Sequence, residues 1–383
     1  MSTTSTAKTA QGQTHVAAAA PVDAGRWPTR LGLLAAAVVG FLLPQLLGGS
    51  ELIYETLVLV AIYSVMAYGA DFILSYLGEV SLGHTLFWAG GAYVTGVATT
   101  IAGWGPITSL LAVLATMTAL AYIVGLFTLR TREFVFSLVT YGSALIALTV
   151  VENIDWLGGS DGIVGIPILE FPAIGGTYTA ATPYQLWPIA FGLLVVTVYF
   201  VARFRRSRLG TRALMVQSNP HLARALGIDP ARVRLAVFTI SAPVSAVAGW
   251  LYAYQRAYVG PDLFEPYFLL LMLTAVILAG RRQLLGPIVG TALIVFQQQM
   301  FSLGSYGDDL VLGGVLALVL LVWPEGLAGV VRSLRRVLPI HRGGRGPTVT
   351  DDDPGGATQG DPARDTVPGA QTQPAGGEDE TSL

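Results

Sequence analysis

The sequence predicts an all-α, polytopic membrane protein of about ten transmembrane or re-entrant helices, and two observations support this fold class. Of the 383 residues, 53% are hydrophobic and 12% are charged, whereas soluble domains carry roughly 25% charged residues. The apolar residues are gathered in runs of roughly 17–25, the length that an α-helix needs to cross a hydrocarbon layer. The chain therefore has the composition and the segment lengths of a helical membrane protein.

Ten apolar segments can be drawn along the chain. Most are long enough for a full crossing, but the eighth and ninth are short and fit a tilted or re-entrant pair. The expected spans are residues 31–47, 52–75, 82–101, 107–129, 133–151, 184–202, 235–256, 266–280, 288–301 and 309–331. The first segment could instead be a cleaved signal peptide behind Arg26 and Arg30. A transmembrane span is favoured, because no small-residue cleavage site is well placed after it.

Basic residues indicate which ends of these spans face the cytoplasm, because inner loops are enriched in Lys and Arg. If the N-terminus is inside and the spans alternate, Arg256 is the only basic residue in an outer loop. The outer loops carry acids instead, namely Glu51, Glu152, Asp155, Asp161, Glu170, Asp262, Glu265, Asp308 and Asp309. We therefore expect a multi-pass protein with its N- and C-termini in the cytoplasm.

Three regions follow from the composition. Residues 1–25 and 336–383 contain few large apolar side chains, so burial cannot offset the entropy cost of ordering them, and we expect both to be disordered. Residues 26–335 form the expected membrane domain. A tail without function is the simpler interpretation of 336–383, and a regulatory tail is the alternative.

Several chemistries are excluded by the sequence. The chain has no cysteine, which excludes disulfides, thiolate catalysis and cysteine metal ligands. Its single lysine, Lys8, is not part of a Gly-Lys-Ser/Thr phosphate loop, so this chain is not expected to bind ATP. His15, His84, His221 and His341 are scattered. We expect no catalytic residue, metal or cofactor in this chain, no enzyme activity and no nucleic-acid partner.

An arginine-rich loop, residues 203–234, separates two long apolar segments. It holds eight arginines and one acid, Asp229. Asn219 suits an N-cap, Pro220 suits the first helical position, and Gly227 suits the left-handed residue that ends a helix. One short helix is therefore expected, made of Asn219, Pro220, His221, Leu222, Ala223, Arg224, Ala225, Leu226 and Gly227. A short helix between two membrane spans is typical of a docking element for another protein.

The connection between the second and third spans concentrates polar residues. Asp71, Glu79, Ser81 and His84 lie within fourteen positions, and the glycines around them permit unwinding or close helix packing. Charged groups are costly inside a bilayer and usually face a bundle interior or water. These four residues are therefore candidates for a transport pathway. The alternative is an ordinary cytoplasmic turn, with Glu79 in solvent and His84 packed in the protein.

The outer loop, residues 152–183, is long for a connection within a compact bundle. Gly158, Gly159 and Gly162 permit tight turns around Asp161, and the loop contains acids but no Lys or Arg. Long loops in compact domains are often functional, so we expect this one to receive a partner protein. An ordinary connector is the alternative.

Together these segments resemble the permease subunits of ABC importers for branched-chain amino acids, of the LivM type. The residues that carry the resemblance lie at 76–84 with 90–93, 158–167, 224–228, 280–290 and 324–327. They are similar to the family's S-L-G-H segment, its outer T-G-G loop, its coupling loop, its G-R-G turn and its P-E-G-L terminus. There are two departures. The family's coupling loop has an acidic residue that is missing between Gln217 and Arg224, and Arg282-Gln283 replaces the usual small residues after the Gly-Arg pair.

The resemblance implies a type II-like ABC importer permease bundle in a bacterial inner membrane. It implies partners as well: membrane lipid, cytoplasmic ATP-binding subunits that use the ATP, a second homologous permease subunit and an extracytoplasmic substrate-binding protein. The docking helix would couple to the ATPase, the 152–183 loop would receive the binding protein, and Asp71 and Glu79 could meet the ammonium group of an amino acid. Relatives with similar segments carry urea, short-chain amides or other amino acids, and an ion-coupled secondary transporter is the alternative of another class.

Overall fold

One buried helix, α2 (Glu51–Tyr76), lies at the centre of the fold. The computed structural model describes residues 37–128, 133–173, 176–280, 282–300 and 314, all within one compact unit of the chain. Helix α2 begins at Ser50, whose hydroxyl accepts from the Ile53 backbone N–H. It ends before Gly78, which has a left-handed φ of +75°. Its most apolar stretch is entirely buried within the protein, so α2 does not face lipid in this chain.

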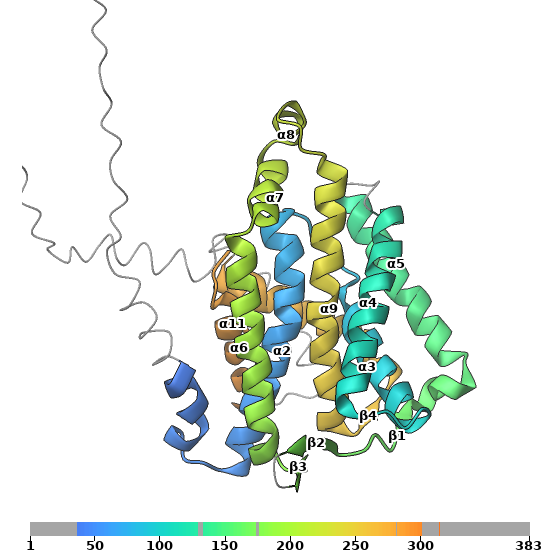
Figure 1. Ribbon diagram of the computed structural model, residues 1–383, viewed down its shortest axis with the longest axis vertical. Coiled ribbons are helices and arrows are strands. Elements are labelled where there is room, and N and C mark those ends of the chain that lie inside the picture. Colours follow the sequence, from blue (N-terminus) through green and yellow to red (C-terminus); the bar gives the residue numbers. More distant parts are fainter. Residues whose placement is uncertain (1–36, 129–132, 174–175, 281, 301–313, 315–383) are drawn as a thin grey trace, which may run out of the picture. The chain divides into compact units, whose positions relative to one another are not determined.

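Helix α9 (Pro230–Arg256) packs along α2 and also contacts α3 (His84–Thr100) and α4 (Pro106–Thr128) (Figure 1). Two glycines bring the α3 and α9 backbones into direct contact. A Cβ atom at Gly91 would lie 2.2 Å from the Ala246 carbonyl oxygen, and one at Gly249 would lie 2.0 Å from the Trp88 carbonyl oxygen. Small residues of this kind permit close helix contact in membranes, where apolar burial between helices gives little driving force.

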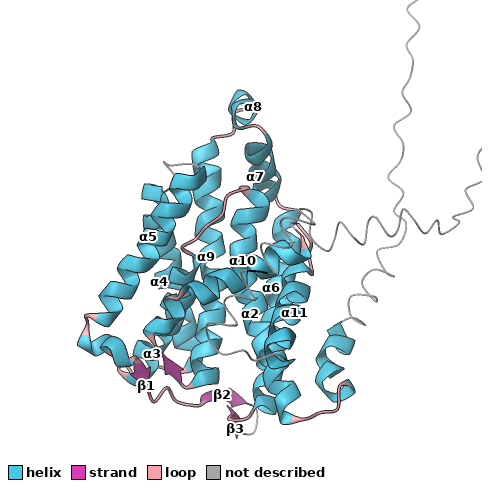
Figure 2. Ribbon diagram, turned by 180° about the vertical axis from the view of Figure 1, so that it is seen from behind, coloured by secondary structure: helices cyan, strands magenta, loops and turns pink. Residues whose placement is uncertain are grey.

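Four further helices surround this core: α5 (Glu133–Glu152), α6 (Pro183–Arg205), α10 (Pro266–Ala279) and α11 (Gly286–Met300). Helix α6 packs on α2, while α10 and α11 contact each other and α2 (Figure 2). Most of the apolar side chains of α4, α5 and α6 are not buried within the chain. These helices therefore provide the apolar surface that suits lipid or a partner subunit.

The described helices agree with most of the expected spans. Five are long and apolar enough to cross a membrane, namely α2, α4, α5, α6 and α9. Helices α10 and α11, with 14 and 15 residues, are about 21–23 Å long at 1.5 Å per residue and too short for a straight crossing. The first expected span is described only over the short helix Ala37–Leu46. The span at 309–331 and the terminal regions 1–25 and 336–383 lie outside the described residues.

Two small antiparallel ribbons lie at the ends of α6 and α9 that are remote from α8. Strand β1 (Ile163–Val164) pairs with β4 (Tyr258–Val259), and β2 (Leu169–Ala173) pairs with β3 (Gly176–Ala180). The 152–183 loop is thus partly ordered by backbone pairing. Strand β4 immediately follows α9, so this pairing fastens the loop to the end of that helix.

Candidate functional site

Helix α8 (Pro220–Ala225) forms where the short helix was expected, and that prediction is confirmed. The Asn219 side-chain oxygen accepts from the backbone N–H groups of His221 and Leu222, each at 3.0 Å, which satisfies two donors that a helix start leaves unpaired. At the other end Gly227 has a φ of +76°. Two backbone bonds of 2.9 Å, from Gly227 to Arg224 and from Ile228 to Ala223, close the helix end.

A second helix in the same loop, α7 (Arg208–Ser218), was missed by the sequence analysis. Ser207 caps its start by accepting from the Gly210 backbone N–H at 3.1 Å. One side of α7 is buried, at Gly210, Ala213 and Val216, and the helix packs on α8 and α9. The three-residue spacing of these small and apolar residues, after a serine, is the signal that could have predicted α7.

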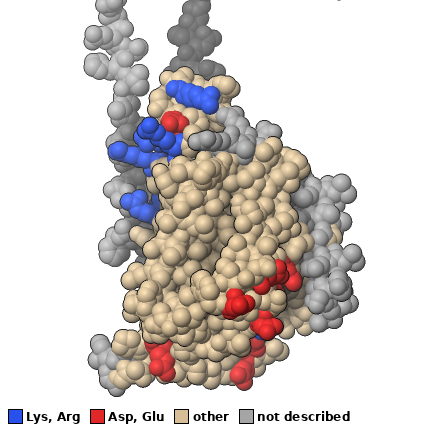
Figure 3. Space-filling model, turned by 90° about the vertical axis from the view of Figure 1, so that its right-hand side faces the viewer, with Lys and Arg blue, Asp and Glu red and all other residues tan. Residues whose placement is uncertain are grey.

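Two exposed leucines, Leu222 in α8 and Leu226 at its C-cap, lie in a basic neighbourhood. Ala223 is buried, whereas Leu222 is 58% exposed and Leu226 is 63% exposed. Figure 3 shows the Lys and Arg side chains gathered at this end of the molecule and acidic side chains toward the other. Exposed leucines on a polar surface are typical of a protein contact site. The role of 219–227 as a coupling helix stays a prediction.

Glu79 forms a buried ion pair with Arg234. The guanidinium donates to the carboxylate at 2.5 Å, and the two side chains are only 12% and 9% exposed. Arg234 belongs to α9, one turn after its N-cap Asp229, so the pair joins the α2–α3 connection to the base of the docking loop. The alternative interpretation of Glu79 as a solvated residue is therefore wrong.

The other pathway candidates make separate contacts. Asp71 is buried on α2 and accepts from the Ser75 hydroxyl at 2.6 Å. Ser81 lies 3.0 Å from His84 Nδ1, at the start of α3, and both are buried. Of the four residues, only Ser81 and His84 contact each other among the described bonds. Because Glu79 is already paired, the expected role of Asp71 and Glu79 in binding an ammonium group would require these contacts to open, and it stays a prediction.

Arg282, one of the two departures from the family pattern, links four elements. It has a left-handed φ of +64°. Its side chain donates to the Ser75 carbonyl at 3.2 Å and to the Gln217 side chain at 2.5 Å, and its own carbonyl accepts from Arg205 at 2.5 Å. The turn between α10 and α11 is thus tied to α2, α6 and α7, beside the docking loop.

The glycines of the outer loop are required by its geometry. Gly158 and Gly162 have φ values of +88° and +72°. A Cβ atom at Gly162 would lie 2.4 Å from the Val259 carbonyl oxygen, so only glycine lets the loop approach β4. Gly159 is also left-handed, and Asp161 is exposed. The proposed reception of a binding protein by these four residues stays a prediction.

Residues 52–322, more than half of the chain, match the family model described as the permease component of branched-chain amino acid transport systems. This chain belongs to that family. The identification agrees with the resemblance drawn from the motifs. A family member is a polytopic helical membrane protein, and as a permease component it is one part of a transport system.

Curated relatives from the family support this assignment. The chain is 26% identical to the high-affinity branched-chain amino acid transport system permease protein LivM of Salmonella typhimurium over 331 residues, which cover 81% of this chain and 77% of the relative. The LivM protein of Escherichia coli is also 26% identical, over 336 residues and the same shares. The corresponding LivH protein of Salmonella typhimurium is 28% identical over 196 residues, half of this chain and 58% of the relative. No solved structure matches the chain.

Proposed function

We propose that this chain is a permease subunit of an ATP-driven importer that carries branched-chain amino acids across a bacterial inner membrane. The observation that carries this proposal beyond family membership is α8, a capped helix with two exposed leucines in the Arg-rich loop. The partner that we expect to bind α8 is a cytoplasmic ATP-binding subunit. This chain holds no cofactor in the proposal, because ATP is bound and hydrolysed by that partner.

The proposed mechanism depends on the contacts that surround α8. When the ATPase subunits close on ATP, they displace α8, and with it α7 and the start of α9. The Glu79–Arg234 ion pair and the contacts of Arg282 pass this displacement to the α2–α3 connection and to the α10–α11 turn. Packed helices have discrete arrangements rather than continuous ones, so the bundle alternates between outward and inward access.

The proposal includes three further features. A second, homologous permease subunit completes the pathway, and the exposed apolar surfaces of α4, α5 and α6 are available for it or for lipid. An extracytoplasmic binding protein delivers substrate to the side that carries the 152–183 loop. Both termini lie in the cytoplasm, on the side of α8. The concentration of arginines around α7 and α8 supports this orientation.

The deciding experiment is purification of this chain from its native membrane in a mild detergent, followed by mass spectrometry and reconstitution into liposomes. We expect ATP-binding subunits and a second permease to copurify, and uptake of leucine, isoleucine and valine to require ATP and the binding protein. If the importer took up only urea, amides or other amino acids, that compound would replace branched-chain amino acids as the proposed substrate. Uptake without partners that collapses with an ion gradient would overturn the proposal in favour of a secondary transporter.

The variant Leu222→Ala with Leu226→Ala tests the role of α8 directly. Buried apolar anchors dominate protein interfaces, so loss of both side chains should weaken copurification of the ATPase. A matched control is Leu52→Ala, an exposed leucine at the start of α2. Neutralising Asp71 and Glu79 together tests their expected contact with the substrate's ammonium group. Unchanged uptake and apparent affinity would remove them from the pathway.

A further inference from the structure

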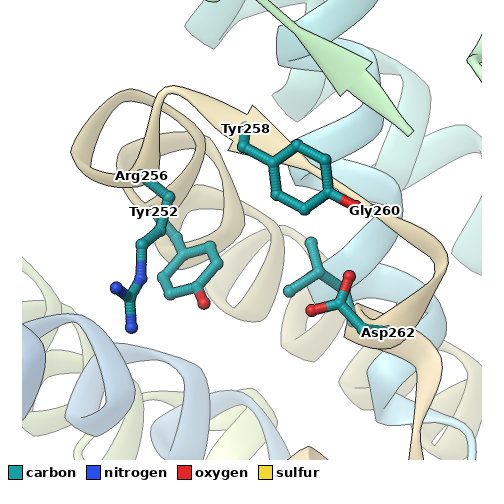
Figure 4. A pocket seen from close by; sticks show the side chains of 6 residues that line it. Tyr252, Arg256, Tyr258, Gly260 and Asp262 are labelled. Atoms are coloured by element: carbon teal, nitrogen blue, oxygen red, sulfur yellow. The ribbon is translucent and has the colours of Figure 1, made fainter. Parts of the chain in front are cut away.

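A small pocket lies at the end of α9 that is remote from α8. It has a volume of about 270 Å³ and is lined by Tyr252, Arg256, Tyr258, Gly260, Asp262 and Leu263. The lining comes from the last turn of α9, strand β4 and the short helix η3 (Pro261–Phe264) (Figure 4). Pockets for drug-sized ligands measure roughly 300–1,000 Å³, so this one suits a smaller molecule.

The pocket holds one positive and one negative side chain. Figure 4 shows Arg256 and Asp262 on opposite sides of the Tyr252 ring. Neither forms an ion pair with another described residue, and both are exposed, so a ligand can reach them. The Arg256 guanidinium carbon lies 5.8 Å from the centre of the Tyr252 ring, a cation–π contact that holds the side chain at the pocket.

The backbone is shaped to bring polar groups together at this pocket. Ala257, at the junction of α9 and β4, has a left-handed φ of +52°, and strained residues of this kind cluster at functional sites. A Cβ atom at Gly260 would lie 2.2 Å from the Tyr258 hydroxyl and 2.4 Å from an Asp262 carboxylate oxygen. Glycine at this position therefore leaves room for both of these side chains.

The remaining walls are apolar and aromatic. Leu263 is almost fully buried, and the Tyr252 ring packs on Trp88 at a centroid distance of 4.9 Å, with Phe268 behind it. A guanidinium binds a carboxylate through two parallel hydrogen bonds, and a carboxylate binds an ammonium group. The pocket thus offers a partner for each charge of a zwitterion and an apolar surface for its side chain.

We propose that this pocket binds a free α-amino acid, with Arg256 on its carboxylate and Asp262 on its ammonium group, at the outer mouth of the permease. The inference rests on the proposed function and adds to it a receiving site on the permease itself. A substrate released by the binding protein would be held there by its two charges before it passes between the helices.

The test uses the whole importer in lipid nanodiscs without the binding protein, and radiolabelled L-leucine as the probe. We expect saturable binding, weakened about tenfold or more in Arg256→Gln and in Asp262→Asn, because each removes a charge-assisted contact. L-Leucinamide and 4-methylpentanoate, which each lack one charge, should compete poorly. The control Glu51→Gln, an exposed acid in the first turn of α2, should bind leucine like the wild type. Both pocket side chains are exposed, so these variants should fold, and size-exclusion chromatography checks this.

The inference is overturned if both pocket variants bind leucine as the wild type does, or if the wild-type importer binds no α-amino acid while it transports leucine. It is also overturned if the variants weaken only the association of the binding protein, since the pocket would then be a docking surface. Failure of the proposed function would look different, because the wild type would then not transport leucine, isoleucine or valine. The inference would still stand in that case if the pocket bound another α-amino acid and this binding required Arg256 and Asp262.

Discussion

Arg234 on α9 donates a 2.5 Å hydrogen bond to Glu79 in the α2–α3 connection, and both side chains are almost buried. The two residues are 155 positions apart in the sequence. Their pairing places the base of the docking loop against the segment that carries Ser81 and His84. It also explains how an ionised acid is accommodated there, because a buried charge requires a partner.

Breaking this pair should destabilise the protein strongly. We expect Glu79→Gln to lower the free energy of unfolding by about 3 kcal/mol, because it removes the buried carboxylate that the Arg234 guanidinium binds. Thermal unfolding in detergent measures the loss. The control is Arg232→Gln, since the Arg232–Asp229 pair is exposed and such pairs contribute about 0–1 kcal/mol. Equal effects of the two variants would show that burial of the Glu79 pair is unimportant.

The cap of α8 gives a second prediction. Asn219→Ala should cost about 1 kcal/mol of helix stability and reduce the ATPase activity that transport substrate stimulates, because α8 loses the bonds to His221 and Leu222. Asn219→Asp keeps an acceptor at the same position and should retain most of the activity. If the alanine and aspartate variants behaved alike, the cap would have no part in coupling.

The direct backbone contact between α3 and α9 gives a third prediction. Gly249→Ala should lower the free energy of unfolding by about 2 kcal/mol or more, as overpacking does, because its Cβ would lie 2.0 Å from the Trp88 carbonyl oxygen. Gly192→Ala on α6 is the matched control, since no atom lies within 4 Å of its added Cβ. That variant should be neutral or stabilised by up to about 1 kcal/mol, because alanine is the better helix former. A destabilised Gly192 variant would contradict this explanation.

The pH dependence of stability should report on Asp262. The Asp262 side chain is open to solvent on one side, but its partial burial raises the pKa of its carboxyl, although the Asp262 backbone N–H and Arg256 oppose the shift. A raised folded-state pKa means that the folded protein binds the proton more tightly than the unfolded chain. The free energy of unfolding should therefore increase as the pH falls through the folded pKa of Asp262, and this gain should be absent above it. Melting temperatures of the wild type and Asp262→Asn between pH 7 and 4 check this, and curves that run parallel would contradict it.

Arg282 yields a prediction about which of two variants at this position is less stable to heat. Its left-handed conformation costs a non-glycine residue roughly 1–2 kcal/mol, and its bonds to Ser75 and Gln217 offset that cost. Arg282→Ala keeps the strain and loses the side-chain bonds, whereas Arg282→Gly loses the bonds and the strain together. The alanine variant should therefore unfold at the lower temperature. The reverse order would show that the turn is not strained.

Local features of this chain were predictable from the sequence, and long-range ones were not. The caps of α8 depend on side chains within three residues of the backbone groups that they bind, so Asn219 and Gly227 could be assigned correctly. Helix α7 was missed because arginines obscure its narrow apolar side. The partner of Glu79 could not be predicted, because it is chosen by the packing of α9 against the α2–α3 connection. Arg256 was recognised as the exceptional outer cation, but its proximity to Asp262 depends on the strained residue Ala257 and the pairing of β1 with β4.

Helix α9 has a consequence for how the two ends of the molecule respond to each other. It contains 27 residues and so extends for about 40 Å. Its first residues lie beside α8, and its last, Arg256, lines the pocket at the other end. Glycine contacts in between prevent it from sliding past α3 without a collision of backbones. A rotation of α9 would change the position of α8 and the shape of the pocket in the same step. A change at either end of the molecule would therefore be transmitted to the other end through α9.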